Sequence, residues 1–124
     1  MNQIIHTNNA PAAIGPYSQA IQAGNTIYVS GQLPIDPATG AFPEGIEEQT
    51  RQSLTNVKAI LNESGLDMDD VVKTTVFLAD LADFAAVNEV YAEFFGDNKP
   101  ARSCVAVHQI PLNARVEIEV TVVK

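Results

Sequence analysis

The sequence has little of what disulfide-bonded or membrane-spanning proteins require. Its 124 residues include one cysteine, Cys104, which excludes an internal disulfide and agrees with a reducing compartment. No apolar run reaches the roughly 18 residues that cross a bilayer. The first ten residues resemble neither a secretory signal nor a transit peptide. We therefore expect a cytoplasmic protein with no membrane association.

Positive charge is also scarce. Seven Lys and Arg residues stand against fifteen Asp and Glu, which gives a net charge of -8 at neutral pH. The basic residues are scattered between Arg51 and Lys124 with no two adjacent, so the sequence shows no basic patch for a phosphate backbone. This charge pattern argues against a nucleic-acid partner.

Motifs for metals and phosphates are missing as well. The two histidines, His6 and His108, and the single cysteine, Cys104, are widely separated and give no metal-ligand cluster. No glycine pattern has the context of a phosphate loop, and no serine lies in a G-x-S-x-G elbow. We expect no metal site and no cofactor.

The apolar residues that are present make up 46% of the chain and are spread along its whole length. There is no repeat or linker-like segment, so residues 1–124 are expected to form one domain. Their periodicity predicts the order β-β-β-α-β-α-β-β and a two-layer α+β fold. The expected strands are residues 3–6, 18–23, 26–30, 71–78, 102–109 and 115–123, and the expected helices are residues 46–64 and the segment from Asp83 to Gly96.

Several local signals accompany this order. Gly24 and Asn25 suit a tight hairpin turn, and Gly65 stands where the first helix should end. Asp83 is expected to cap the second helix, whose stripe of Phe84, Val87, Tyr91 and Phe94 is expected to enter the core. The loop at residues 31–45, with three prolines and three glycines, is a connector that can border a pocket.

Two strands near the C-terminus carry the reactive side chains. Alternation places Arg102 and Cys104 on one face of their strand, and Glu117 and Glu119 on the polar face of the last strand. If these strands formed a simple hairpin, Cys104 would lie opposite Glu117. A guanidinium suits a substrate carboxylate and a carboxylate can activate water, although spacing alone favours ordinary surface charges. Cys104 has no base at a recognised spacing and is expected to be an inert thiol.

The motif PARSCV at residues 100–105, followed by VEIE at residues 116–119, closely resembles the C-terminal signature of the RidA/YjgF family. The resemblance extends in family order over nearly the whole chain. It includes APAAIGPYSQ at residues 10–19, SGQLP at 30–34, NVKA at 56–59 and FAAVNEVY at 84–91. On these motifs the chain is identified as a member of that family.

Membership implies a chorismate-mutase-like fold, in which two helices cover one face of a mixed sheet. It implies a homotrimer with clefts between neighbouring subunits. It also implies a cofactor-free deaminase that converts the reactive imines 2-iminobutanoate and 2-iminopropanoate, products of pyridoxal-phosphate enzymes, into 2-oxo acids and ammonia. The implied partners are thus the small-molecule imine or 2-oxo acid and two further copies of the chain.

The resemblance also assigns roles to individual residues. Arg102 matches the arginine that grips the substrate carboxylate, the backbone of Cys104 matches a group that positions substrate and water, and Glu117 matches the acid that orients or activates water. Four further positions, Tyr17, Ser30, Gly31 and Asn88, match residues that line the cleft. The resemblance implies that Tyr17, Ser30, Gly31 and Glu117 face Arg102, Cys104 and Asn88 across a subunit boundary.

Two departures from the family pattern affect the expected substrate preference. His108 and Gln109 stand where many members carry a small residue followed by arginine, and the loop at residues 96–99 is shorter than in some enterobacterial relatives. Other functions remain open at this stage. They are a trimer that senses 2-oxo acids without turnover, an endoribonuclease or translation inhibitor, and a holdase-type chaperone.

Overall fold

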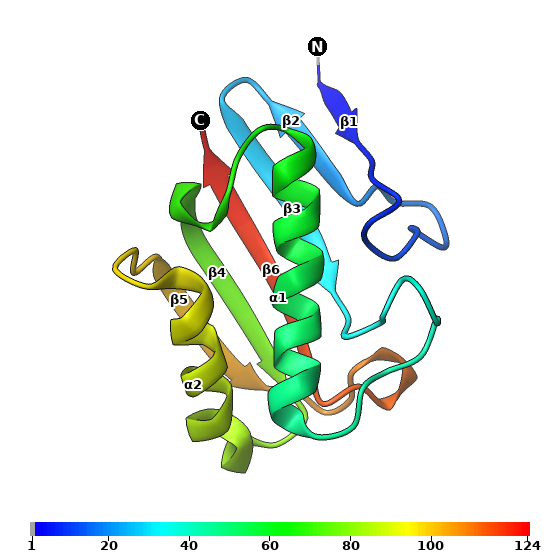
Figure 1. The fold of residues 1–124 in the computed structure, drawn as a ribbon, viewed down its shortest axis with the longest axis vertical. Helices are drawn as coiled ribbons and strands as arrows, with labels where there is room; N and C mark the ends of the chain where they lie inside the picture. The colour runs from blue at the N-terminus through cyan, green and yellow to red at the C-terminus, as the bar shows by residue number, and fades with distance from the viewer. Residues whose placement is uncertain (1) are drawn as a thin grey trace.

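The computed structural model describes residues 2–124, which form strands and helices in the predicted order (Figure 1). The elements are β1 (Gln3–Ile5), β2 (Ala20–Ala23), β3 (Thr26–Gln32), α1 (Ile46–Glu63), β4 (Val71–Leu78), α2 (Phe84–Phe95), β5 (Ala101–Ala106) and β6 (Val116–Val123). Short 3₁₀ turns lie at η1 (Met68–Asp70), η2 (Leu81–Asp83) and η3 (Pro111–Asn113). Within residues 2–124, neither α-helix is long and apolar enough to span a bilayer.

The strands form one six-stranded sheet in the order β1-β2-β3-β6-β4-β5. β4 and β5 are parallel, and the other neighbouring strands are antiparallel. Both helices lie on the same face of this sheet, as Figure 1 shows. The predicted two-layer α+β fold with a mixed sheet is therefore confirmed.

The core lies between α1 and the central strands. On β6, Val116, Ile118, Val120 and Val122 are buried while the residues between them are more exposed, as the alternation predicted. Leu54, Val57, Ile60 and Leu61 of α1 are fully buried against them. Each buried side chain of this size contributes about 1.5–3 kcal/mol, so the α1–β6 contact is a main source of stability.

Two glycines adopt positive φ angles at the helix end and the hairpin turn that the sequence predicted. Gly65 has φ +76°, and the end of α1 is closed by hydrogen bonds from Gly65 N–H to Asn62 O and from Leu66 N–H to Leu61 O, both 3.0 Å. This pattern is a Schellman motif, which satisfies carbonyl groups that a helix end leaves free. Gly24, with φ +61°, makes the turn between β2 and β3.

The start of α2 lies where the sequence predicted, but the predicted side-chain cap is absent. The helix begins at Phe84, but the Asp83 carboxylate does not cap it. Both of its oxygens instead accept hydrogen bonds from Arg115 Nη2, at 2.8 and 3.0 Å. Asp80 caps the preceding turn by accepting a 2.9 Å hydrogen bond from Ala82 N–H. A nearby guanidinium thus outcompetes the backbone for the Asp83 side chain.

The expected core stripe of α2 is also only partly correct. Val87, Val90 and Phe95 are the buried residues of this helix, whereas Phe84 is 40% exposed and Tyr91 is half-buried. Phe95 stacks at a tilt against Tyr91, with ring centroids 4.4 Å apart. Phe84 and Tyr91 of this helix therefore lie at the side of the core and face Arg102 of β5.

The hypothetical hairpin of the last two strands is wrong. β4 lies between β5 and β6, and it pairs Val76 with Cys104 on one side and Phe77 with Glu117 on the other. Paired residues point to the same face of a sheet. Cys104 therefore points with buried Val76 toward the helices, and Glu117 points with Phe77 toward the open face. The crossover through α2 makes β5 parallel to β4, which removes it from contact with β6.

Candidate active site

A cavity of about 560 Å³ lies beside the end of β3. Its walls come from the segment between β1 and β2, the segment that follows β3, η3, and β6. The lining residues are Pro11, Ala12, Ala13, Ile14, Tyr17, Gln19, Ser30, Gly31, Gln32, Leu33, Ile35, Pro111, Leu112 and Glu117. Below, this cavity is called the cleft. It brings together four of the expected site residues, and the loop at residues 31–45 borders it as predicted.

Glu117 is the ionisable group of the cleft. Burial raises the pKa of this carboxyl above its usual value, and the neighbouring Glu119 raises it further. In the part of the chain that the structure describes, no hydrogen-bond donor or basic side chain pairs with Glu117. A half-buried carboxyl with a raised pKa is suited to accept and return a proton near neutral pH.

Gly31 allows the Glu117 side chain to occupy its position. A Cβ added at residue 31 would lie 2.5 Å from Oε2 and 2.9 Å from Cδ of Glu117. Such distances are far inside van der Waals contact, so a side chain at residue 31 would force the Glu117 carboxylate to move. The role of Gly31 is therefore to permit close approach and not to provide a left-handed turn.

Ser30 and Tyr17 lie at the open side of the cleft. The Ser30 hydroxyl donates a 2.6 Å hydrogen bond to Ser18 O, and Ser30 N–H donates to Gln19 O at 2.9 Å. With its proton committed to the backbone, the Ser30 oxygen is left as an acceptor. Tyr17 is 54% exposed, so its ring forms part of the rim.

Two buried carboxamides hold the loops that form the cleft. Gln19 Nε2 donates to Pro11 O at 2.8 Å, which fixes the segment before β2. Asn56 of α1 is fully buried and donates to Leu33 O at 3.1 Å and Ile35 O at 2.9 Å. Because irregular loops lack their own ladder of hydrogen bonds, these amides supply the missing donors. They hold the backbone segments that line the cleft in place.

A third carboxamide, Gln49, ties the ends of two segments together. Its Nε2 donates to Pro43 O at 3.2 Å, and its Oε1 accepts from Arg115 N–H at 3.0 Å. Sequence reasoning missed all three amides. The available signal was that Gln49 and Asn56 stand on the apolar face of α1, where a polar residue requires a hydrogen-bond partner.

Arg102 belongs to a different cluster, between β5 and α2. Its Nη1 donates a 2.7 Å hydrogen bond to Asn88 Oδ1, and the guanidinium carbon lies 4.8 Å from the Tyr91 ring centre and 5.4 Å from that of Phe84. The Tyr91 hydroxyl shares a 2.8 Å hydrogen bond with Thr74 Oγ1, which fixes that ring. Among residues 2–124, no carboxylate lies within 4.0 Å of the Arg102 guanidinium. This cation is thus oriented but has no anionic partner.

Cys104 lies beside Arg102 on the same strand face and packs against the core. Burial raises the pKa of its thiol, and the charge of Arg102 offsets this only in part. A thiol that stays protonated is a poor nucleophile. The structure therefore favours the reading of Cys104 as an unreactive side chain.

Within one chain, the Arg102 cluster and the cleft lie on opposite sides of the sheet. Arg102 is paired across the sheet with fully buried Thr74, beneath the helices, whereas Glu117 is paired with Phe77 on the open face. The grouping of residues agrees with the resemblance, which puts Arg102, Cys104 and Asn88 on one side of the site. The hairpin argument, which put Cys104 beside Glu117, does not hold.

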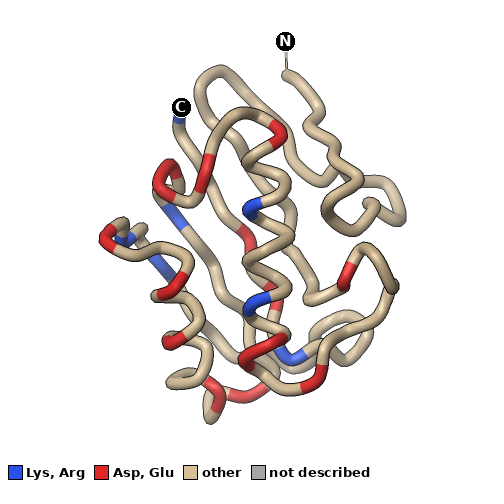
Figure 2. Tube along the Cα trace, viewed as in Figure 1, with Lys and Arg blue, Asp and Glu red and all other residues tan. Residues whose placement is uncertain are grey.

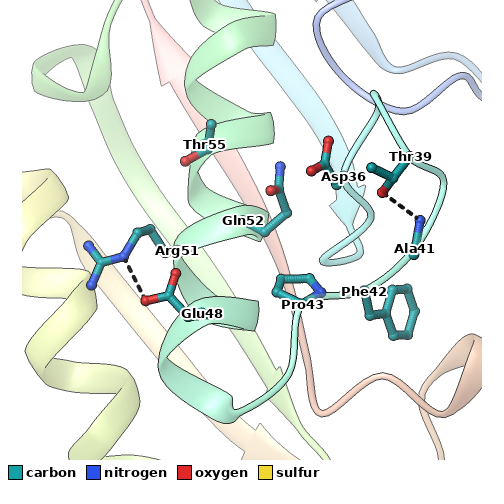
Figure 3. Close-up of a pocket in the computed structure, with 9 residues that line it drawn as sticks. All are labelled: Asp36, Thr39, Ala41, Phe42, Pro43, Glu48, Arg51, Gln52 and Thr55. Atoms are coloured by element: carbon teal, nitrogen blue, oxygen red, sulfur yellow. Dashed lines mark hydrogen bonds and ion pairs between the residues drawn. The ribbon is translucent and has the colours of Figure 1, made fainter.

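A second cavity, of about 250 Å³, lies between α1 and the segment around residues 36–43 (Figure 3). The one basic side chain in its lining, Arg51, already pairs with Glu48 and with Glu93 of α2. This cavity therefore offers no free cation to an acidic ligand. Lys and Arg are likewise spread over the trace in Figure 2 and do not gather on one face.

In the described residues, no three His, Cys, Asp or Glu side chains gather closely enough to hold a metal ion. The candidate site therefore consists of a carboxyl in a preformed cleft and a separately held guanidinium. Together, fold and site define a small two-layer α+β protein with a cleft that holds one ionisable carboxyl group.

Comparison with known proteins gives this class a family. The family described as endoribonuclease L-PSP matches residues 7–124 of the chain. The chain belongs to this family, which is the RidA/YjgF family that its motifs indicated.

Individual relatives agree over the full length. A RutC family protein of Pyrococcus horikoshii is 55% identical over 96% of this chain and 95% of its own. The 2-iminobutanoate/2-iminopropanoate deaminase of Escherichia coli is 51% identical over 100% and 99%. Among solved structures, Escherichia coli TdcF with bound serine superposes with a TM-score of 0.95 at 46% identity, covering 98% of both chains. The fold and the family are thus established together.

Proposed function

We propose that this protein hydrolyses 2-imino acids, 2-iminobutanoate and 2-iminopropanoate among them, to 2-oxo acids and ammonia. The observation that carries this proposal is that one chain supplies two complementary groups. These are the carboxyl of Glu117 in the cleft, with its raised pKa, and the guanidinium of Arg102, which has no anionic partner among the described residues. A 2-imino acid needs both, because it has a carboxylate to be held and a C=N carbon to be attacked by water. Relatives that are 51% identical and carry the deaminase name support the same reaction.

The chemistry follows from these two groups. Arg102, kept in orientation by Asn88 and Tyr91, would hold the substrate carboxylate with two parallel hydrogen bonds. Glu117 would take a proton from water as the water oxygen bonds to the imine carbon. Glu117 would then pass this proton to the nitrogen, and it would take the proton of the new hydroxyl group as the C–N bond breaks and the C=O bond forms. The departing ammonia would accept that second proton and leave as ammonium, which returns Glu117 to its ionised form. Positioning supplies much of the rate, since a protonated imine is already electrophilic.

The two groups must meet across a boundary between chains, because one chain holds them on opposite sides of its sheet. We propose a homotrimer in which the cleft of one subunit receives the Arg102 cluster of the next. The open face of the sheet supports this assembly, since Tyr28 and Val105 are 56% and 44% exposed there. Exposed apolar side chains on one face of a sheet are compatible with an oligomer interface.

Binding without turnover is the second candidate function. The structure of TdcF holds serine, an amino acid with the carboxylate that a sensor would also recognise. A sensor, however, needs only the guanidinium, and it gains nothing from a carboxyl with a raised pKa. Cleavage of RNA, which the family description names, is disfavoured by the net charge of -8 and by the dispersed basic residues (Figure 2).

The experiment generates 2-iminobutanoate with threonine dehydratase in the presence of semicarbazide and follows semicarbazone formation. The wild-type protein should suppress the semicarbazone because it removes the imine first, and the Arg102→Ala variant should not. Arg51→Ala is the matched control, since Arg51 lies in the other cavity. Suppression by neither wild type nor control would leave the sensor function, which binding of 2-oxobutanoate would then test.

A further inference from the structure

We infer that Leu112 is a specificity-determining residue, which contacts the substrate side chain and favours apolar 2-imino acids over polar ones of the same size. This inference rests on the proposed function and deepens it. It starts from an unusual position: Leu112 has φ +59° and ψ +21°, and the next residue, Asn113, has φ +58°. A leucine rarely adopts this left-handed conformation, and such positions concentrate at functional sites.

The turn that carries Leu112 is held rigidly. Ile110 and Ala114, at its two ends, are only 2% and 1% exposed. Asn113 N–H donates to Ile110 O at 3.1 Å, and Ala114 N–H donates to Pro111 O at 3.3 Å. The turn therefore holds Leu112 in a fixed position, where its side chain cannot enter the core. Leu112 is 71% exposed and lines the cleft.

Leu112 belongs to the apolar wall of the cleft. This wall also includes Ile14, which is 87% exposed, and Leu33, Ile35 and Pro111. A cavity of about 560 Å³ is of the size that holds small-molecule ligands. An imine bound beside Glu117 would thus direct its side chain along this wall, toward Leu112.

The two carboxamide side chains in this lining already donate to backbone carbonyl groups. Gln19 Nε2 donates to Thr7 O at 3.0 Å and Pro11 O at 2.8 Å, and Gln32 Nε2 donates to Ser30 O at 3.1 Å. A polar substrate side chain would lose hydrogen bonds to water and find few replacements here, because Gln19 Nε2 already donates to two carbonyl groups and Gln32 Nε2 has used one of its two N–H groups. An apolar side chain loses nothing and gains burial against Leu112.

The test compares imines from leucine and from asparagine, whose side chains have nearly the same shape but differ in polarity. A broad-specificity amino-acid oxidase with catalase forms each imine, and semicarbazide traps what the protein leaves. Wild type should act on the leucine-derived imine with a kcat/KM about tenfold above that for the asparagine-derived one. In Leu112→Asn, a residue that tolerates the left-handed conformation, this ratio should fall to near unity. In Leu81→Asn, which changes another exposed leucine (54% exposed) on η2 that does not line the cleft, the ratio should stay at the wild-type value.

Each outcome decides the inference. An unchanged ratio in Leu112→Asn, with the wild type active on 2-iminobutanoate, overturns it and leaves the proposed function intact. A wild type that is inactive on 2-iminobutanoate overturns both. A Leu112→Asn protein that elutes from size exclusion with a different oligomeric state also overturns it, because Leu112 would then cover a neighbouring chain.

Discussion

Gly31 and Glu117 are in such close contact that any side chain at residue 31 would collide with the carboxylate: an added Cβ would lie 2.5 Å from Oε2. The far end of a glutamate is flexible, so Gly31→Ala is expected to fold with Glu117 displaced from the cleft. A displacement on the order of 1 Å at a reacting group lowers kcat by about 10²-fold. Semicarbazone suppression measures this loss.

Shortening the acid gives a matched test of the steric cause. In the double variant Gly31→Ala with Glu117→Asp, the smaller carboxylate no longer meets the added methyl group. Its thermal stability should exceed that of Gly31→Ala alone. Additive effects of the two substitutions on the free energy of unfolding would show that the residues do not interact.

Glu117 should make the protein less stable at neutral pH. Its pKa in the folded chain lies above the unfolded value of 4.5, so the folded state resists ionisation. Stability then falls as the pH rises from 4.5 through the raised value, and the penalty persists above it. Glu117→Gln removes this penalty and should raise the midpoint of thermal unfolding at pH 7 by a few degrees.

The pH dependence of this difference from wild type tests whether Glu117 destabilises the folded protein. The difference in midpoint between Glu117→Gln and wild type should vanish below pH 4.5, where the wild-type carboxyl is protonated in both states. Activity should fall by about 10²-fold or more, since the proton acceptor is gone. A lower midpoint for Glu117→Gln at pH 7 would contradict the expected sign, because it would mean that folding favours the ionised carboxylate.

Asn88 keeps Arg102 oriented without neutralising it. In Asn88→Asp, the new carboxylate would form an ion pair with Arg102 over the 2.7 Å contact that Asn88 Oδ1 now makes. That pair competes with a substrate carboxylate, so the affinity for 2-oxobutanoate should weaken by at least about tenfold. Isothermal titration measures this, with Asn62→Asp on the exposed face of α1 as the charge-matched control. Equal affinities of the two variants would mean that Arg102 does not bind the ligand.

Mixing two inactive variants tests whether the site is shared between subunits. Arg102→Ala chains keep Glu117, and Glu117→Gln chains keep Arg102. If each site takes one group from each of two chains, random reassembly of equal amounts restores about a quarter of the wild-type rate. Refolding of the mixture from denaturant, followed by the semicarbazide assay, shows this recovery. No recovery from a mixture that reforms the wild-type oligomer would place both groups in one chain.

Asn56 should matter for stability and for the shape of the cleft. Asn56→Leu has nearly the same volume but leaves the part-buried carbonyl groups of Leu33 and Ile35 without this donor. The expected loss is about 2–4 kcal/mol in the free energy of unfolding. Urea denaturation measures it, and Asn62→Leu on the same helix is the exposed control. A loss below that of the control would mean that the loop finds other donors.

Local patterns in the sequence determined most of the secondary structure. The three- and four-residue spacing of Leu54, Val57 and Ile60 predicted α1, and Gly65 predicted its end, because helix periodicity and left-handed caps depend on near neighbours. Alternation along residues 115–123 likewise predicted β6 and its buried face. The strands predicted at residues 3–6 and 102–109 are shorter in the structure, where they span Gln3–Ile5 and Ala101–Ala106. A strand ends where the neighbouring strand no longer provides hydrogen-bond partners, and local sequence does not reveal that point.

Contacts between distant residues could not be predicted in the same way. The capping role of Asp83 was wrong because Arg115 competes for its carboxylate, and Phe84 and Tyr91 flank Arg102 where a core position was expected. The amides of Gln49 and Asn56 were missed because their partners lie in irregular segments. None of these contacts follows from the spacing of residues along the chain.

For the candidate site, too, the sequence determined some features and the tertiary structure decided others. The sequence by itself, through its motifs, determined the family and named Arg102 and Glu117, and it predicted which neighbours share a face of each strand. Only the tertiary structure decided that β4 separates β5 from β6, and that Arg102 lies beneath the helices while Glu117 lies on the open face. The physical reason is that period-two alternation sorts the side chains of a strand into two sets. Which set faces the helices depends on strand pairing and on the side where the helices pack, and both are properties of the whole fold.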